Sequence, residues 1–289
     1  MDHVTLISRP PLRRPVLLAA FDGWNDAGES ATGALDAISS ELEATTFATV
    51  DPEEFYDFQA TRPTVRLVEG IRHVEWPAAE LRAARLPAAD HDLILLRGHE
   101  PNLRWRTFAA EVMEVAASLG VEMVVTVGAL LADVPHTRPT QVVSSTSDPL
   151  LAERLGLPLS RYEGPTGILG VLADAAARLG IPAVGLWAAL PHYLHLAPNP
   201  WGAMALVEEL GRLLPVSVDT AGLAGQTEAF DQAVTDLIDE NPELAGYVER
   251  LEADADDEED PPGLADLPPE QFVAEVERYL RDHPGGSRG

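Results

Sequence analysis

The feature that most limits the fold is an alternation of short apolar segments with longer amphipathic ones. The short segments are at least partly β-branched and are followed by turn residues, as in strands buried on both faces: 16–21, 92–96, 121–127 and 183–188. Helical patterns follow at 26–42, 104–119, 165–179 and 199–214. This alternation predicts an α/β fold with a doubly wound, mostly parallel sheet.

Two further short segments within residues 1–218 are predicted to form a β-hairpin at one edge of that sheet. They are 65–68 and 72–76, and the loop Glu69, Gly70 and Ile71 between them fits a tight turn only in part. The α/β domain is expected to end at residue 218, after the segment 214–218, which is rich in Pro and Val.

The rest of the chain is predicted to be a C-terminal helical extension in three parts. Residues 219–253 form a helical hairpin, whose first helix, 228–240, has Phe230, Val234, Leu237 and Ile238 on one face. Residues 254–268 form an acidic linker. Residues 269–289 form a short amphipathic helix with a flexible tail, and its apolar stripe consists of Phe272, Val276, Tyr279 and Leu280. This helix either docks on its own chain or binds a partner.

Composition removes several classes of function. The chain has no cysteine and no lysine, which excludes disulfides, thiolate metal sites, a phosphate-loop lysine and Schiff-base chemistry. Its net charge of -27 opposes binding to nucleic acid and to anionic membranes. Residues 219–289 hold 20 acidic and 4 basic residues, a net charge of -16. Without an apolar run long enough for a signal peptide or a membrane span, we expect a cytoplasmic protein.

Polar residues gather where the predicted strands end, and open α/β sheets bind ligands in the crevice at that edge. The candidate crevice residues are Asp22, Asn25, Asp26, Glu100, Arg104, His136, Arg138, Glu163 and His192. The arginines could bind an anionic metabolite or an acidic partner segment, but arginine–glutamate pairing across a loop explains "HEPNLRWRTF" equally well.

The turn "FDGWNDAGESATGA", residues 21–34, is the strongest test of a phosphate site. It has neither the G-x-G-x-x-G spacing of a dinucleotide fold nor a Gly-Lys-Ser/Thr motif, and its own carboxylates would compete with a phosphate. Asp26 is instead interpreted as a helix N-cap, and Gly28 and Gly33 as sites of close helix packing. Ser30 does not lie in a nucleophile elbow. His192 and His195 have no third metal ligand. We therefore assign no catalytic residue, metal or cofactor.

Several motifs resemble, in the same order, the single-chain actinobacterial members of the proteasome assembly chaperone family. They are "GWNDAGESA", "EPNLRWRTFAAEV", "TVGALLADVPHTRP", "EGPTGILGVL" and "LPHYLHLAPNP", and the resemblance spans about residues 14–250. It implies an α/β fold similar to nucleoside phosphorylases, without an established catalytic set. Eukaryotic members guide assembly of proteasome α-rings. Some archaeal relatives bind the proteasome through a penultimate tyrosine, a position that Tyr279 does not occupy.

Two functions are consistent with these observations. The first is a non-enzymatic assembly chaperone or adaptor that binds proteasome subunits or another protein. The second is a small-ligand-binding protein or a hydrolase- or phosphorylase-like enzyme that uses the crevice. Because the relatives pair through this domain, we also expect a homo-oligomer, with Trp187, Tyr193 and Trp201 as interface aromatics.

Overall fold

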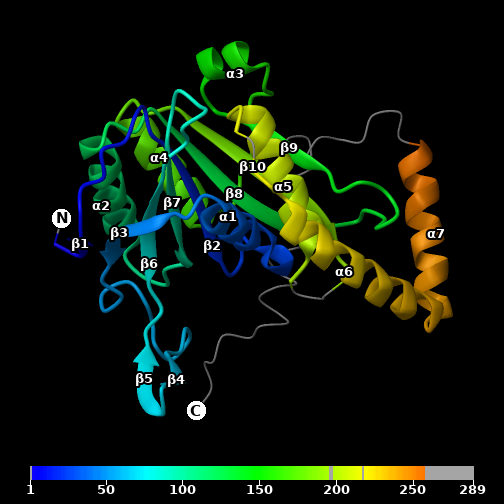
Figure 1. The fold of residues 1–289 in the computed structure, drawn as a ribbon. Helices are drawn as coiled ribbons and strands as arrows, with labels where there is room; N and C mark the ends of the chain where they lie inside the picture. The colour runs from blue at the N-terminus through cyan, green and yellow to red at the C-terminus, as the bar shows by residue number, and fades with distance from the viewer. Residues whose placement is uncertain (1, 195–197, 217, 258–289) are drawn as a thin grey trace.

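The core of the molecule is a twisted sheet of eight strands with helices on both faces (Figure 1). The computed structural model describes residues 2–194, 198–216 and 218–257. The four central strands are parallel: β7 (Leu93–His99), β2 (Val16–Asp22), β8 (Met123–Ala132) and β10 (Ala183–Pro191). These are the strands that the apolar segments predicted, and the α/β fold class is confirmed.

The sheet is completed by antiparallel strands that the sequence analysis missed. On one side, β6 (Ala79–Ala84), β3 (Thr45–Val50) and β1 (Val4–Leu6) follow β7, and on the other side β9 (Val142–Ser145) pairs with β10. β1 and β9 are short edge strands, and β3 and β6 have partly exposed positions, so all four lack the continuous apolar runs by which the central strands were recognised.

Alternate residues of each central strand face opposite helical layers. In β2, Val16, Leu18 and Ala20 belong to one buried cluster, whereas Leu17, Ala19 and Phe21 belong to the other. The first cluster includes α1 (Ser30–Glu41) and α5 (Pro200–Leu213), and the second includes α2 (Trp105–Ser118) and α4 (Ile168–Arg178). The predicted helix at 26–42 is split into a 3-10 turn, Ala27–Glu29, and α1. A short helix, α3 (Pro149–Leu155), follows β9.

The predicted hairpin forms, but the prediction that it extends the main sheet is wrong. Strands β4 (Thr64–Val68) and β5 (Ile71–Glu75) pair only with each other and project from the body (Figure 1). Pro63 and Pro77, which cannot donate a backbone hydrogen bond, flank the pair. The turn contains two residues, Glu69 and Gly70, and both have positive φ, as a tight type I′ turn requires.

The C-terminal end of the described chain consists of two helices, α6 (Ala221–Asp239) and α7 (Pro242–Asp257). Phe230 and Val234 of α6 form a small apolar cluster with Leu194, and Leu237 and Ile238 pack against it. Helix α7 continues to residue 257, so the first residues of the expected acidic linker are helical. The amphipathic helix expected at 269–282, with Phe272, Val276, Tyr279 and Leu280, lies outside the described residues.

Candidate functional site

The turn after β2 is organised by Asp26, whose side chain is 6% exposed. Its Oδ1 accepts hydrogen bonds from the backbone N–H groups of Ala31 (2.6 Å) and Thr32 (3.2 Å), and its Oδ2 accepts one from the Thr32 hydroxyl. Asp26 therefore caps α1, as expected, although Glu29 is the residue next to the helix. Because these amides at the start of α1 already have a partner, they do not form an anion site.

The environment of Asp26 favours its neutral form. Burial and, to a smaller extent, the charge of Asp22 raise the pKa of its carboxyl to about 6, against the opposing effect of the hydrogen bonds from Thr32 and Ala31. Asp26 thus combines a structural role with a pKa near the physiological range.

Glu100 performs a similar task for α4. Its Oε1 accepts hydrogen bonds from Nδ2 of Asn25 and from the backbone N–H of Ile168, both at 2.8 Å. A Cβ added to Gly167, which precedes α4, would lie 2.5 Å from Oδ1 of Asn25 and 2.8 Å from Oε1 of Glu100. Burial raises the pKa of Glu100, although its two hydrogen bonds lower it. Glu100, Asn25 and Gly167 are thus packed into one closed junction.

His99 lies beside this junction and was missing from the predicted crevice. Because β2 and β7 are parallel and in register, Asp22 is the cross-strand neighbour of His99, and their Oδ1 and Nδ1 atoms are 2.6 Å apart. The Tyr56 hydroxyl donates to the carbonyl of His99 (2.9 Å). The pair could accept and pass on a proton, but within the described chain no serine or threonine hydroxyl donates to it. In the sequence, only the position of His99 at the end of a strand indicates that it belongs to this site.

The remaining predicted crevice residues do not join this group. Arg104, exposed at the start of α2, forms an ion pair with Glu54, and Arg138 forms one with Asp256 of α7. Glu163 is exposed on the segment before α4. For Arg104 in "HEPNLRWRTF", the geometry thus supports pairing with a carboxylate across a loop.

His136 and His192 belong to a second group, which fastens α6 and α7 to the sheet. The backbone N–H of His136 donates to the Tyr193 hydroxyl (2.7 Å), and the His136 ring stacks on Trp201 with centroids 6.2 Å apart. Trp201 meets Phe230 of α6 edge to face (4.8 Å), and its Nε1 donates to Asp231 (2.6 Å). Tyr193 and Trp201, expected at an oligomer interface, therefore pack within their own chain.

The same group extends to α7. His192 and Tyr193 both contact the ring of Tyr247, and Thr137 donates a hydrogen bond to Glu252. Burial lowers the pKa of His136, although the charge of Glu252 raises it. Burial also raises the pKa of Tyr193 to about 12. His192 pairs with Asp133 at 3.1 Å, and over residues 2–194, 198–216 and 218–257 no three metal-ligating side chains gather.

A cavity of about 220 Å³ lies between α4 and the face of β8, β10 and β9 that carries Trp187. Its lining includes Trp24, Asn25, Tyr162 and several hydroxyl side chains. Trp187 fills the space above Gly128, where an added Cβ would lie 2.6 Å from the indole ring. The Oδ1 atom of Asn25 is buried and has no hydrogen-bond partner in the described chain. This cavity runs along the face of the sheet, from the start of β10 at Ala183 to Trp24 and Asn25 after β2, and among the described hollows it most resembles a ligand site.

Comparison with known proteins places this fold and these motifs in context. The PAC2 family pattern matches residues 20–238. A PAC2 family protein from Streptomyces avermitilis is 46% identical, with a TM-score of 0.76 over 81% of this chain and 99% of that one. The Mycobacterium tuberculosis proteasome-assembly chaperone homologue Rv2125 is 44% identical, with a TM-score of 0.73 over the same shares. The comparison with curated proteins gives no match.

One structural relative also covers the C-terminal helices. The M. tuberculosis protein of unknown function Rv2714 is 26% identical, with a TM-score of 0.80 over 97% of this chain and 96% of that one. Within the described residues, every helix is too short or too polar to cross a membrane.

Proposed function

We propose, because this chain belongs to the PAC2 family, that it is a non-enzymatic assembly chaperone or adaptor that works by binding other proteins. The observation that carries the proposal is the use of the buried carboxylates at the strand ends. Asp26 holds the first turn of α1, and Glu100 holds the first residue of α4. In most α/β enzymes such positions contact a substrate. Here they contact the protein's own backbone.

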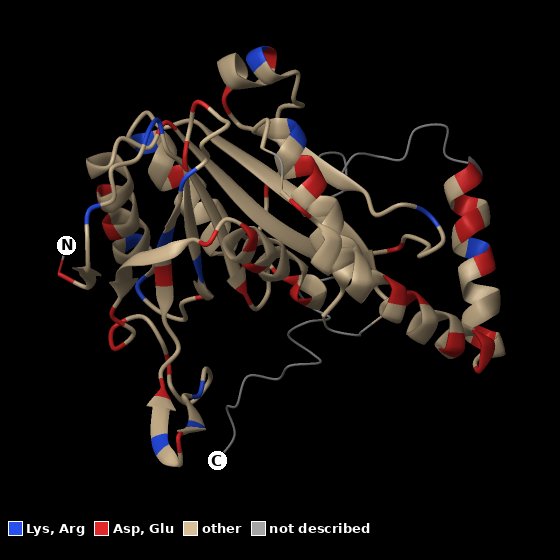
Figure 2. Ribbon diagram, viewed as in Figure 1, with Lys and Arg blue, Asp and Glu red and all other residues tan. Residues whose placement is uncertain are grey.

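The partner-facing surface is proposed to lie in the C-terminal extension, residues 219–289. Residues 219–257 contain 12 acidic residues and a single arginine, and Figure 2 marks acidic positions along α6 and α7. The apolar stripe of α6 is turned toward the body, so its charged residues face outward. A partner with a basic surface would be attracted over a long range. The segment 269–282 is proposed to continue this surface.

Proteasome subunits are the first candidate partners, because the 44% identical relative is a proteasome-assembly chaperone homologue. Self-association and a cytoplasmic location belong to the same proposal. Affinity purification of the tagged chain from its native cell, followed by mass spectrometry, tests it. We expect proteasome subunits to be enriched over an untagged control.

A matched variant makes the purification specific. A chain that ends at Asp257 keeps α7 and its ion pair to Arg138, so it should fold normally and recover less partner. Recovery of the same partners in equal amounts would remove residues 258–289 from the proposed surface. Absence of any enriched protein would contradict the adaptor function itself.

A second candidate function, binding of a small ligand, is favoured by the cavity beside Trp187. Its hydroxyl and indole lining suits a compact, partly apolar molecule with a hydrogen-bond donor for Asn25. Native mass spectrometry of the purified protein tests this candidate: a stoichiometric bound molecule that is lost in Gly185→Leu would favour it. A mass equal to that of the bare chain would argue for the adaptor.

A further inference from the structure

The β4–β5 hairpin projects from the body as an arm, which we define as residues 62–76. Every residue of both strands is exposed. At its base, Trp76 meets Phe58 edge to face, with ring centroids 4.7 Å apart. An isolated two-stranded hairpin is at best marginally stable in water. The arm therefore needs a covering surface that the described part of its own chain does not supply.

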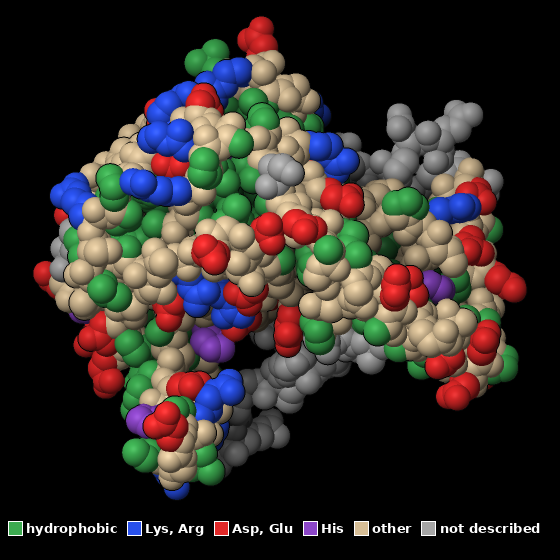
Figure 3. Space-filling model, in the orientation of Figure 1, with side chains coloured by type: hydrophobic (Ala, Val, Ile, Leu, Met, Phe, Trp, Pro, Cys, Tyr) green, Lys and Arg blue, Asp and Glu red, His purple; other side chains and the backbone are tan. Residues whose placement is uncertain are grey.

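One face of the arm is apolar. Cross-strand pairing places Val65 opposite Val74 and Leu67 opposite Arg72, and Trp76 follows on the same side. The four apolar side chains are between 45% and 75% exposed. Val68 and Ile71 at the tip pair with each other on the opposite face and are 50% and 62% exposed. Over the two faces the six expose apolar surface on the order of 500 Å², which is comparable to the largest apolar patch of a typical monomer and smaller than one partner's share of a standard interface. Figure 3 shows hydrophobic and basic side chains side by side on the arm.

The charge of the arm differs from that of the rest of the protein. Three arginines, Arg62, Arg66 and Arg72, outnumber Glu69 and Glu75, so the arm has a net charge of +1 in a chain of -27. Arg66 and Glu75 pair with each other at 2.6 Å. The arm therefore suits an acidic surface with an apolar floor.

The described chain offers such a surface in a groove of about 460 Å³ between α1, α6 and the start of α5. Its floor is made of small and apolar residues, including Gly33, Ala37, Ala203 and Leu223. Four carboxylates and one guanidinium line it: Glu29, Asp36, Glu41, Asp219 and Arg97. Arg97 pairs with Asp36 at 2.9 Å, so the groove has a net charge of -3.

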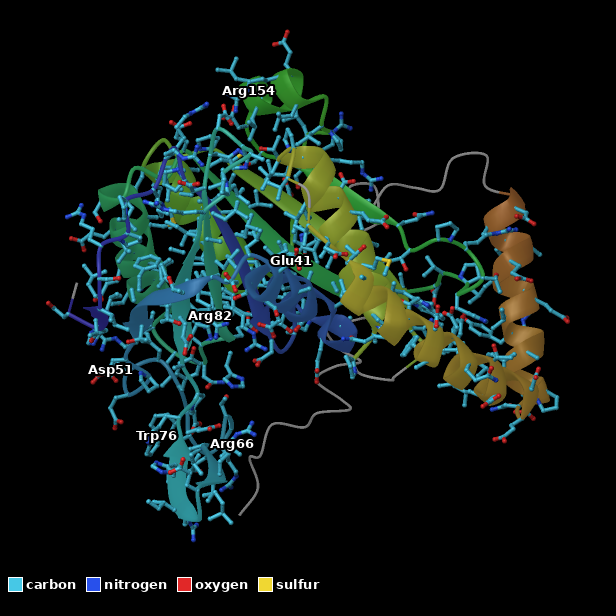
Figure 4. All side chains as sticks on the ribbon, in the orientation of Figure 1. Glu41, Asp51, Arg66, Trp76, Arg82 and Arg154 are labelled. Carbon is cyan, nitrogen blue, oxygen red and sulfur yellow. The ribbon has the colours of Figure 1, made fainter. Side chains whose placement is uncertain are left out.

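Arm and groove are separated within one molecule. In Figure 4, Arg66 and Trp76 lie on the projecting arm, whereas Glu41 lies on α1 against the body. We propose that the arm of one copy packs in the groove of a second copy, with its apolar face on the floor and its arginines at the acidic rim. A two-fold dimer or a closed ring then fills every groove. Residues 258–289 contain 8 acidic residues and 3 arginines, so their net charge has the same sign as that of the groove.

The absence of cysteine allows a direct test by engineered disulfides. Leu67→Cys, at the arm, is mixed with Ser40→Cys, which lines the groove, under mild oxidation. The control mixes Leu67→Cys with Arg154→Cys, on exposed α3 and far from both in Figure 4. We expect at least tenfold more intermolecular disulfide with Ser40→Cys. Equal yields would overturn the proposal, as would cross-linking that requires removal of residues 258–289.

A second measurement uses the full chain without cysteine. The double variant Leu67→Asp, Val74→Asp should reduce the mass in light scattering to that of a 31.1 kDa monomer, at a concentration where the unmodified protein is larger. Its far-ultraviolet circular dichroism should not change, because these side chains bury little in their own chain. A monomeric unmodified protein would refute the inference. The measurement uses purified protein alone, so it tests self-association separately from the proposed binding of proteasome subunits.

Discussion

At the scale of single residues, the proposed non-enzymatic function depends on which groups the carboxylates after β2 and β7 contact. Asp26 and Glu100 both combine burial with hydrogen bonds to a helix start, so each is costly to ionise and costly to remove. This combination links stability to pH in a way that a solvent-exposed catalytic carboxylate would not show.

Asp26 should destabilise the protein progressively as the pH rises from about 4 to about 6. The pKa of its carboxyl is raised from 3.8 to about 6, so the folded state binds the proton more tightly than the unfolded state, and that advantage is lost as the pH rises through this window. The full effect is on the order of 3 kcal/mol. Urea unfolding across this range should show that the free energy of unfolding of Asp26→Asn changes less with pH than that of the unmodified protein. The amide of the variant keeps the bonds to Ala31 and Thr32.

The matched variant separates charge from capping. Asp26→Ala removes the acceptor for buried amides and should cost about 2 kcal/mol near pH 4. The cost should shrink as the pH rises to about 6, because only the unmodified protein loses stability over this window. If Asp26→Asn retained the full pH dependence, the titrating group would be a different one and the assignment to Asp26 would be wrong.

Gly167 should tolerate no side chain. Gly167→Ala would place a Cβ 2.5 Å from Asn25 Oδ1 and should destabilise the protein by about 2 kcal/mol, because the junction with Glu100 must open. Gly225→Ala, on the exposed face of α6 with open space around it, is the control and should stabilise by roughly 0.5–1 kcal/mol through helix propensity. If chemical denaturation gave the same loss in the free energy of unfolding for both variants, the junction would not be closed.

At the scale of elements, the docking of α6 and α7 should weaken in acid. Burial lowers the pKa of His136 below its ordinary value of 6.5, so the folded state disfavours its protonation, and stability is lost as the pH falls below that value. The protection factors of the α7 amides, which correct for the intrinsic pH dependence of hydrogen exchange, should fall as the pH is lowered from about 7 to about 5, whereas those of β2 should not. His136→Phe should abolish this dependence, and an unchanged profile in that variant would assign the effect to another group.

The elements also show how far the sequence determines the fold. Continuous apolar runs predicted β2, β7, β8 and β10 because these strands are buried on both faces. The pattern could not place β3, β6 and β9, whose exposure alternates or varies along the strand. The hairpin was recognised from its strands, but its detachment from the sheet depends on Pro63 and Pro77, whose effect on the path of the chain is a property of the whole fold.

The candidate site was predictable in position but not in its connections. The strand-end rule located Asp22, Asn25, Asp26 and Glu100 in one region, and the capping preference identified the role of Asp26. It could not show that Arg104 and Arg138 pair with Glu54 and Asp256, because those partners lie far away in sequence. Likewise, Tyr193 and Trp201 have the composition of an interface, and only the packing of Phe230 shows that the surface they meet belongs to α6.

At the scale of the whole molecule, charge is divided between a less acidic α/β body and a strongly acidic C-terminal extension. Residues 1–218 have a net charge of -11, and residues 219–289 have one of -16. Partner binding should therefore slow as salt is raised from about 0.05 M to 0.5 M, because screening shortens electrostatic steering. Stopped-flow association with a captured partner should show the effect, and its absence in a chain that ends at Val218 would locate the charge responsible in the C-terminal extension.

The central claim, that this PAC2 protein acts by binding unassembled proteins and not by catalysis, is tested most directly by reconstitution. Purified protein is mixed with separately produced, unassembled proteasome α subunits, and the species formed are followed by native mass spectrometry. We predict a stoichiometric complex with free α subunits and faster formation of the α-ring. The rate of ring formation should be the same with Asp26→Asn, because the Asp26 carboxylate serves only α1. No complex, with ring formation at the rate of α subunits alone, would contradict it.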